Sequence, residues 1–434
     1  MSNKEKPTIA TGGEAALVPK LRFPEFQDAD GWKEISFQRL ARPVTDRATT
    51  GDADNVLSLS GEHGLVLQSD YFGKKIAGDS TDRYLKIRKD DFVYNDRTTK
   101  ASSFGTIKRL SNYPGGIVSP IYKCFRFQPS ENPVFWEWYF ESGSHDPALG
   151  GLVNEGARAG RFNISVTQFL STNAWRPDVP EQQKIADCLA SADALFDAQR
   201  RKVEALKAHK KGLMQKFFPQ EGETQPRLRF PEFRDAGDWD STILGRLSDV
   251  VRGGSPRPID GFITNASDGL NWLKIGDVDK DSKFVTKTAD KVRRDALSKT
   301  RVVNPGDLIL SNSMSFGRPF ILQISTCIHD GWIAVRRIDE KIIRDFLYYL
   351  ILSPGSQDYF VGNAAGGGVQ NLNADIIKFL PIQFPCRAEQ ERIAGVLASL
   401  DDLIAAEKRK LDTLRTHRNG LMQQLFPSVG EDDA

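Results

Sequence analysis

The 434-residue sequence is poor in the features that mark membrane, secreted and metal-binding proteins. It contains no run of 18 apolar residues, which argues against a transmembrane helix, and residues 1–20 lack the hydrophobic core of a signal peptide. Only 4 cysteines and 5 histidines occur, and none falls in a C-x-x-C or H-E-x-x-H pattern. We therefore expect a cytoplasmic protein with reduced thiols, no metal site and a flexible N-terminal tail.

Motifs for nucleotide chemistry are missing as well. There is no G-x-x-x-x-G-K-[ST] loop and no N-P-P-[FY] run, and the glycines at 366–368 lack the downstream helix and acid of a dinucleotide fingerprint. We therefore expect no catalytic residue and no cofactor in this chain. The net charge of +2 neither indicates nor excludes a nucleic-acid binder, because basic residues can be clustered on one surface.

An internal repeat dominates the sequence. Residues 21–26 read LRFPEF, and residues 228–233 read LRFPEF again, 207 positions later. Residues 181–219 and 389–427 also match, at an offset of 208, whereas the stretches between these segments agree only faintly. Constant frames around divergent inserts indicate two copies of one design that face two different targets.

The matched segments at the end of each copy predict two long helices, 179–219 and 387–427. Apolar residues recur at steps that alternate between four and three, which is the 3.5-residue stripe of a coiled-coil seam, although an ordinary four-helix core is the alternative. The seam comprises Ile185, Leu189, Ala192, Phe196, Gln199, Val203, Leu206, Lys210, Leu213 and Phe217, and then Ile393, Leu397, Leu400, Ile404, Glu407, Leu411, Leu414, Arg418, Leu421 and Leu425.

Polar residues interrupt the two seams at equivalent places, Gln199 with Glu407 and Lys210 with Arg418. A parallel pairing in register would set Lys210 against Arg418, and like charges in a buried layer are costly. An antiparallel pairing about a pseudo-twofold axis would instead place Lys210 opposite Glu407, and Gln199 opposite Arg418. We therefore predict an antiparallel coiled coil.

The same register makes two further predictions. It places Ala192 opposite Leu425, and Phe217 opposite Leu400. The overlapping stretch would be ~38 Å long at ~1.5 Å per residue, which is close to one turn of B-DNA at ~34 Å.

The two inserts mix short strand-like runs with turns and each predicts an α+β domain. Predicted strands are DFVYND from Asp91, GGIVSPIYKCFRF from Gly115, LILSNSM from Leu308 and GWIAVRR from Gly331. Helices are predicted at matching places, in NPVFWEWYFES from Asn132 and in IIRDFLYYLILS from Ile342. The expected order is a tail (1–20), a first domain (21–178), a central helix (179–219), a connector (220–239), a second domain (240–386), a C-terminal helix (387–427) and a tail (428–434).

This arrangement resembles the specificity subunit of a type I restriction–modification system. The resemblance rests on the paired LRFPEF boxes, the EQQKIA and EQERIA helix starts, and the GLMQKFFP and GLMQQLFP helix ends. In the second insert, RGGSPRP, WLKIGD, CIHDGW and GVQNLN add to it, whereas the first insert has GRFNIS in place of GVQNLN and no SPRP loop. The resemblance covers nearly the whole chain after residue 21.

The resemblance implies a non-catalytic reader of double-stranded DNA. Each target-recognition domain would read one half of a bipartite, gapped target, and the helix pair would set the number of unread base pairs. Two modification subunits would dock on the helices and methylate adenine with S-adenosylmethionine. Restriction subunits, which act as translocase and nuclease, would join for cleavage. S-adenosylmethionine, ATP and Mg are therefore expected on partner subunits.

DNA contacts require side chains whose donors and acceptors match base edges, or cations that meet phosphates, presented on loops. A solvated loop residue is the alternative for each one, and a helix cap is the alternative for Asn163 and Asn371. The first-domain candidates are Asn95, Arg97, Thr98, Lys100, Ser102, Arg158, Arg161 and Asn163. The second-domain candidates are Arg252, Ser255, Arg257, Ser311, Asn312, Ser313, Arg318, Gln370, Asn371 and Asn373.

Two other classes of function compete with DNA recognition. One is a two-headed coiled-coil adaptor that binds protein or glycan partners through its variable domains, and a steep salt dependence of DNA binding would separate it from a DNA reader. The other is an enzyme with a site in each insert. Duplicated catalytic sites should repeat their functional groups, and the inserts share few polar residues.

Overall fold

The computed structural model describes residues 16–49, 52, 55–73, 81–99, 102–152, 162–220, 222–279, 281–312, 317–364 and 371–427. The chain divides into two compact units, which are unit 1 (residues 1–199 and 410–434) and unit 2 (residues 200–409). Each unit contains one globular α/β region and parts of both long helices. In the described ranges, no helix is both long enough and apolar enough to cross a membrane.

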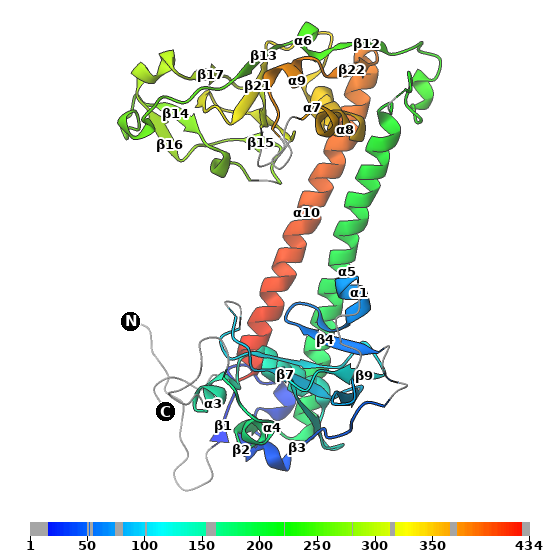
Figure 1. Cartoon of the computed structure of the whole chain (residues 1–434), viewed down its shortest axis with the longest axis vertical. Helices are drawn as coiled ribbons and strands as arrows, with labels where there is room; N and C mark the ends of the chain where they lie inside the picture. Colours follow the sequence, from blue (N-terminus) through cyan, green and yellow to red (C-terminus); the bar gives the residue numbers. More distant parts are fainter. Residues whose placement is uncertain are drawn as a thin grey trace. The chain divides into compact units, whose positions relative to one another are not determined.

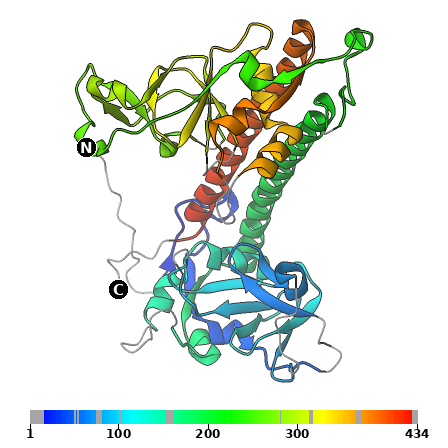
Figure 2. The same ribbon diagram turned by 45° about the horizontal axis from the view of Figure 1, so that its top comes forward.

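The two predicted long helices are present. Helix α5 spans Val179–Phe217 and helix α10 spans Arg387–Leu425, each with 39 residues. In both views, α10 lies beside α5 within each unit (Figures 1 and 2). Figure 1 also shows the sheets of each unit beside the ends of these helices.

The helices run in opposite directions. In unit 2, the Nζ atom of Lys210 lies 2.5 Å from Asp401 Oδ1, and Lys202 Nζ lies 3.0 Å from Glu407 Oε1. Residue numbers therefore fall along α5 as they rise along α10, which confirms the antiparallel prediction. All twenty predicted seam residues are buried or half-buried, so the predicted stripe is the contact face.

The predicted register of the helix pair is wrong by about one heptad. Lys210 pairs with Asp401 rather than with Glu407, and Arg418 pairs with Asp193 rather than with Gln199. The physical reason is charge. In the predicted register Arg418 would meet an uncharged amide, whereas in the observed register both seam cations meet a carboxylate at the edge of the seam.

The apolar contacts between the helices are shifted from the predicted ones in the same way. Leu425 lies in the same buried cluster as Ile185 and Leu189 of α5, not opposite Ala192 as predicted. In unit 2, Phe217 shares a buried cluster with Ile393, Ala394 and Leu397, nearer the start of α10 than the predicted Leu400.

Each LRFPEF box binds the start of a long helix through its arginine. Arg22 Nη2 lies 2.8 Å from Glu181 Oε2 at the start of α5, and Arg229 Nη2 lies 2.6 Å from Glu389 Oε2 at the start of α10. The side chains of both pairs are 7% exposed or less. The indole of Trp32 adds a longer hydrogen bond of 3.4 Å to Glu181.

The same boxes also bind the end of the opposite helix. The backbone N–H of Leu21 donates to the carbonyl of Gln424 in α10 (3.0 Å), and that of Leu228 donates to Lys216 in α5 (2.9 Å). Short 3-10 turns follow, η1 (Pro24–Phe26) and η4 (Pro231–Phe233). Each box therefore joins the start of one helix to the end of the other, which explains why both the boxes and the helix ends repeat.

The two units repeat one sheet topology. In unit 1 the strand orders are β3-β10-β7-β8 and β5-β4-β9-β6, and in unit 2 they are β13-β21-β18-β19-β15 and β16-β14-β20-β17. The β4–β9 and β14–β20 pairs are parallel at the same place in both copies, and unit 2 has a further parallel pair, β15–β19. A further strand pair, β2–β11 or β12–β22, lies beside each set, and β1 adds to β2.

The described elements of unit 1 are β1 (Ala16–Leu17), β2 (Trp32–Ser36), β3 (Ala41–Pro43), β4 (Val56–Ser60), β5 (Gly64–Leu67), α1 (Gln68–Phe72), β6 (Leu85–Arg88), β7 (Phe92–Asn95), β8 (Thr106–Arg109), β9 (Gly115–Val118), β10 (Lys123–Phe127), α2 (Pro133–Glu141), α3 (Asp146–Gly150), α4 (Val166–Leu170) and β11 (Asn173–Arg176).

Those of unit 2 are β12 (Asp240–Ile243), α6 (Leu244–Leu247), β13 (Asp249–Arg252), β14 (Leu270–Leu273), β15 (Phe284–Val285), β16 (Asp290–Val292), β17 (Arg301–Val303), β18 (Leu308–Ser311), β19 (Pro319–Leu322), β20 (Thr326–Ile328), β21 (Trp332–Arg336), α7 (Arg344–Leu352), α8 (Pro354–Asn363), α9 (Ala374–Lys378) and β22 (Pro381–Phe384).

One predicted strand, the run from Gly115, is two strands. β9 and β10 are separated by a turn in which Tyr122 N–H donates to the Ser119 carbonyl (3.1 Å), and they lie in different sheets. Pro120 lies in this turn, where it has no N–H to offer a ladder. The strands predicted at 91, 308 and 331 and the helices predicted at 132 and 342 are confirmed as β7, β18, β21, α2 and α7.

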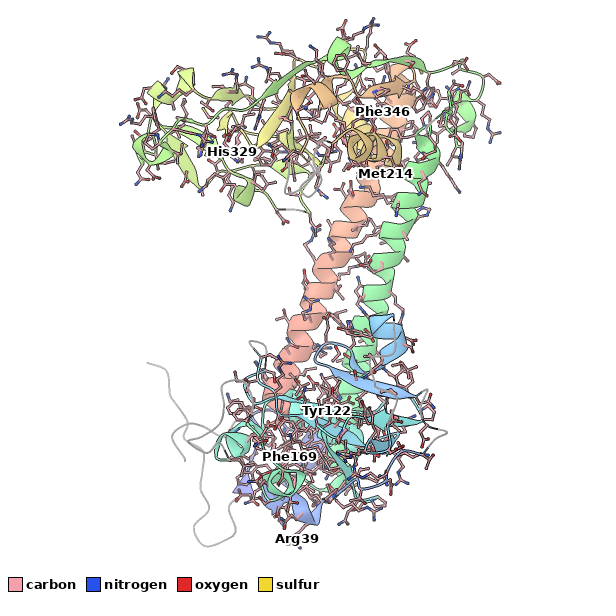
Figure 3. All side chains as sticks on the ribbon, in the orientation of Figure 1. Arg39, Tyr122, Phe169, Met214, His329 and Phe346 are labelled. Carbon is pink, nitrogen blue, oxygen red and sulfur yellow. The ribbon has the colours of Figure 1, made fainter. Side chains whose placement is uncertain are left out.

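Each unit has an aromatic core where its sheet meets the helices. In unit 1, Phe37, Trp136 and Phe169 are fully buried in one cluster that also receives Leu425. In unit 2, Met214 of α5 and Phe346 of α7 lie in one cluster. Figure 3 labels Phe169, Met214 and Phe346. Burial of such side chains stabilises each unit by ~1.5–3 kcal/mol apiece, and it fixes the sheet edges that carry the candidate site.

Candidate nucleic-acid interface

In unit 2 the sheet topology brings three chain segments to one edge. β13 and β18 both pair antiparallel with β21, so both of them end where β21 begins. The loop after β13, the residue after β18 and the turn before β21 therefore meet at this edge. These segments carry the predicted residues Arg252, Ser255, Arg257 and Asn312.

These four predicted residues converge on Asp330. Ser255 Oγ donates to Asp330 Oδ1 (2.7 Å), and Arg257 Nη2 lies 3.2 Å from Oδ2. The backbone carbonyl of Asp330 accepts from Arg252 Nε at 3.0 Å and from Asn312 Nδ2 at 3.4 Å. A single acidic residue thus ties together the polar groups that the sequence assigned to DNA contact.

The neighbourhood of Asp330 favours its charged form. The hydrogen bond from Ser255 is the largest cause that lowers the pKa of Asp330; burial opposes it, and the Arg257 guanidinium adds to the lowering. Burial lowers the pKa of the adjacent His329, whose Nδ1 accepts from the Gly331 N–H at 2.7 Å. His329, labelled in Figure 3, is therefore a neutral hydrogen-bonded support for the turn.

Two glycines allow this close approach of loop and turn. A Cβ at Gly253 would overlap the carbonyl oxygen of His329, and one at Gly254 would lie 2.6 Å from the carbonyl oxygen of Lys299. The N–H groups of Gly253 and Gly254 donate to Trp332 and Ile328. The glycine pair before Ser255 is therefore needed for packing at this edge.

Unit 1 has a corresponding edge, where β3 and β7 end beside the start of β10. Its central residue is Asp96, which is fully buried and accepts an ion pair from Lys123 Nζ at 2.6 Å. Asp96 Oδ2 also accepts a hydrogen bond from the backbone N–H of Ile164 (3.3 Å). The backbone carbonyl of Asp96 accepts one from the N–H of Phe162 (3.2 Å). It thus joins the β7–β8 loop to the segment before α4.

The predicted residues of unit 1 flank Asp96. Arg97 is exposed and Thr98 is half-buried. The side chain of Asn95 accepts from the Arg97 N–H (3.3 Å), and Ser102 folds back on Thr99 and Gly105. Asn163 is exposed, in the left-handed conformation at φ 57°.

Several predicted residues have other roles. Ser311 is fully buried in β18, a central strand covered on both faces, and so it does not face solvent. Asn373 is the N-cap of α9 and accepts from Ile376 N–H (2.9 Å). The cap alternative is wrong for Asn163, because Ser165 caps α4.

Arg318 is half-buried, with its guanidinium over the Phe320 ring. Asn371 is exposed, since the cap position of α9 belongs to Asn373. The remaining candidates lie outside the described residues, namely Lys100, Arg158, Arg161, Ser313 and Gln370.

Asp96, Lys123 and Asp330 were missed by the sequence analysis. Neither acid is among the residue types that the sequence analysis expects at base edges, and Lys123 lies inside the run from Gly115 that predicts one strand. A usable signal existed, since Asp96 directly follows a predicted strand and Asp330 directly precedes one. Residues at strand ends on one edge of a sheet lie close to loops from other parts of the chain, so their side chains can connect these loops.

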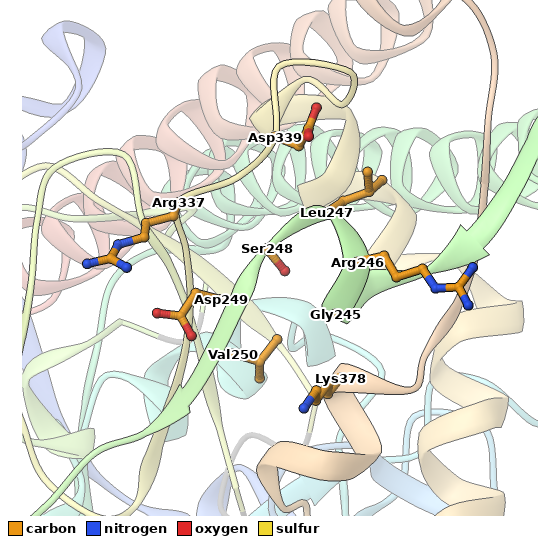
Figure 4. A pocket seen from close by; sticks show the side chains of 9 residues that line it. All are labelled: Gly245, Arg246, Leu247, Ser248, Asp249, Val250, Arg337, Asp339 and Lys378. Carbon is orange, nitrogen blue, oxygen red and sulfur yellow. The ribbon is translucent and has the colours of Figure 1, made fainter.

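A hollow of 440 Å³ lies at the opposite end of β13. It is lined by Arg246, Arg337 and Lys378, together with Asp249 and Asp339. Figure 4 shows the side chains of Arg246 and Arg337 pointing away from one another. The hollow is therefore not a cradle for one phosphate. Among the described residues, no group of three His, Cys, Asp or Glu side chains is placed to hold a metal ion.

Comparison with known proteins identifies the class of this fold. Residues 244–416 match the family described as type I restriction modification DNA specificity domain. A putative type I restriction enzyme MjaX specificity subunit of Methanocaldococcus jannaschii is 24% identical over 274 residues, covering 61% of this chain and 60% of the relative. The MjaVIII specificity subunit of the same organism is 25% identical over 262 residues, covering 58% and 60%.

Solved structures show the same fold. The type I restriction–modification S subunit from M. genitalium aligns with a TM-score of 0.55 and 13% identity, over 95% of this chain and 100% of that one. A chain from a study of complex assembly and conformational transition of a type I system aligns with a TM-score of 0.54 and 18% identity, over 92% and 98%.

The match over residues 244–416 and these relatives make the chain similar to the specificity subunits of type I restriction–modification systems, and the resemblance seen in the sequence is confirmed. The aligned region spans about 60% of the length of the curated relatives.

Proposed function

We propose that this chain is the DNA-recognition subunit of a type I restriction–modification system and is itself not catalytic. The recognition domains, 21–178 and 240–386, each read one half of a bipartite, gapped target in double-stranded DNA. One observation carries the proposal. Two copies of the same sheet edge, held on the same helix frame, present different polar residues around Asp96 and around Asp330. A reader of two unlike half-sites needs this combination of constant frame and variable contacts.

The helices supply the spacing and the docking surface in this proposal. Both α5 and α10 begin in one unit and end in the other, so their shared length sets the number of unread base pairs. Leu195 and Leu403 occupy equivalent positions outside the seam and are 61% and 41% exposed. The two helices repeat one sequence pattern, including these leucines, which favours two copies of one partner, and we assign these copies to two modification subunits.

The remaining partners follow from the same proposal. S-adenosylmethionine serves the modification subunits, and ATP with Mg serves the restriction subunits, in the cytoplasm. The present chain only recognises the target sequence in the DNA.

Sequencing of methylated adenines in cells that carry this chain with its modification subunit tests the proposal. We expect one gapped, asymmetric motif whose two halves are unlike. The purified complex should bind a duplex with this motif more tightly than a scrambled duplex, and its affinity should fall steeply with salt. Equal binding of both duplexes, or methylation of an ungapped motif, would contradict the proposal and favour the adaptor alternative.

A further inference from the structure

The Arg257 side chain occupies an unusual position in the cluster around Asp330. Its side chain is 80% exposed, yet its guanidinium is held by Asp330 at 3.2 Å. Only one nitrogen, Nη2, makes this contact, so the other donors of the planar fork remain directed elsewhere. An exposed arginine that is fixed at one nitrogen loses less conformational freedom on binding than a free one.

The Asp330 carboxylate is fixed from the opposite side. Ser255 Oγ donates to its Oδ1, and the Asp330 N–H lies 3.3 Å from the same hydroxyl. The carbonyl of Asp330 is held by Arg252 and Asn312. The orientation of the carboxylate is therefore fixed before DNA binds. Because Asp330 holds the Arg257 guanidinium, it also orients the Arg257 side chain.

We propose that Asp330 is a positioning residue for base reading and that Arg257, held by Asp330, reads a guanine in the second half of the target. The inference rests on the proposed function and names the contact that would give unit 2 its specificity. Arginine matches O6 and N7 of guanine in the major groove with two parallel hydrogen bonds, which a phosphate contact does not require. A carboxylate beside the arginine also disfavours phosphate, because like charges repel.

The test measures binding of the full complex to the gapped duplex identified by methylome sequencing. It uses duplexes with one base pair changed at each recognised position and a scrambled duplex. Arg257→Ala and Arg257→Lys should each lose about tenfold of discrimination at one guanine position. Arg257→Lys keeps the positive charge, so its affinity for the scrambled duplex and its salt slope should stay unchanged.

Asp330→Asn should lose discrimination at the same position while binding of the scrambled duplex holds or rises. Adding Arg257→Ala to it should cause no further loss, because the two residues act as one unit. Asp330→Glu is a second variant, which keeps the charge and moves the carboxylate by one methylene. It should weaken the same position. Asp260→Asn, at an exposed acid of the short 3-10 helix Ile259–Gly261 that follows, serves as the matched control and should leave discrimination unchanged.

Two outcomes overturn the inference. One is an equal loss on specific and scrambled duplexes in the Arg257 variants, which would make Arg257 a phosphate contact. The other is additive losses at different positions in the double variant. Both leave the proposed function standing, whereas wild-type complex that fails to prefer any gapped duplex would remove the proposed function itself.

Discussion

The same sheet edge is built in two ways in the two units. In unit 1 its acid is Asp96, fully buried and paired with Lys123 of β10. In unit 2 the acid is Asp330, in the turn before β21, with a side chain that is 41% exposed and paired with Arg257. Asn312 follows β18 as Asp96 follows β7. The ion pair of unit 1 therefore has its acid buried inside the domain, whereas the ion pair of unit 2 lies at the surface.

The helix frame shows no such difference. Arg22 with Glu181 and Arg229 with Glu389 are buried pairs of the same geometry in the two units. Gln182 and Gln390 likewise each accept a backbone N–H, from Asn132 and from Ile343. Contacts that hold the helices are repeated, while contacts at the sheet edge have diverged. The comparison therefore separates the repeated residues that hold the helices from the diverged residues at the sheet edge.

Breaking the buried arginine–glutamate pair should give the largest effect. Arg22→Met and Arg229→Met each leave a buried glutamate without its counter-charge, and each should destabilise its unit by about 3–5 kcal/mol. Urea unfolding of the full chain, with hydrogen exchange followed by mass spectrometry to locate the loss, would measure this. Equal losses in units 1 and 2 would confirm an identical frame.

Exposed ion pairs on the same helices provide the control. Lys184 with Glu25 and Arg392 with Glu232 sit at equivalent positions and are about half-exposed. Lys184→Met and Arg392→Met should each destabilise the chain far less than Arg22→Met or Arg229→Met, because solvent screens exposed ion pairs. A loss in one unit only would show that the two frames are not equivalent, and losses no larger than in these controls would show that the buried pairs do not hold the helices.

The sequence predicted the long elements well because their signal is local and repeated. A seam that continues through most of a 39-residue helix indicates a helix pair whatever surrounds it. The register was missed because it depends on Asp193 and Asp401, which lie beside the seam and not in it. The order of strands in the sheets was not predictable either, since the sequence of a four-residue strand does not indicate which strand it pairs with. The split of β9 from β10 shows this most clearly.

The candidate site was predicted in outline. Residue type and loop position led to Arg252, Ser255, Arg257 and Asn312, which the structure brings together. Burial decided against Ser311, and only the backbone geometry shows that Asn373 caps a helix. These facts come from tertiary packing, which one sequence does not display.

A difference in acid sensitivity should follow from His145 in unit 1. Its complete burial lowers its pKa to about 3, and Nε2 lies 3.2 Å from Thr172 Oγ1. The unfolded chain, with a histidine pKa of about 6.5, binds the proton first. The stabilisation by neutral His145 is therefore full above about pH 7 and is lost as the pH falls from about 6.5 toward 3, with about 2 kcal/mol lost by pH 5.

Hydrogen exchange of each unit at pH 7 and pH 5 would measure this prediction. Unit 1 should lose more protection than unit 2, where the burial of His329 is opposed by Asp330. His145→Phe should flatten the pH dependence of unit 1, and His63→Gln, at an exposed histidine of unit 1, should not. An unchanged slope in His145→Phe would show that other groups cause the acid sensitivity.

The smallest effect should come from the carboxylates at the edge of the helix seam. Asp193 in unit 1 and Asp401 in unit 2 are equivalent and meet Arg418 and Lys210. Asp401 also accepts a hydrogen bond from Tyr349 Oη at 2.7 Å, and burial, then Asp401, raises the pKa of Tyr349, so the phenol stays a donor.

Asp193→Ala should therefore cost no more than about 1 kcal/mol, and Asp401→Ala about 1 kcal/mol more, because it leaves the Tyr349 hydroxyl without its acceptor. Urea unfolding of the full chain would measure both. In a Tyr349→Phe background, Asp401→Ala should cost only as much as Asp193→Ala. A gap that persists in that background would mean that the two halves of the helix pair differ in more than this one hydrogen bond.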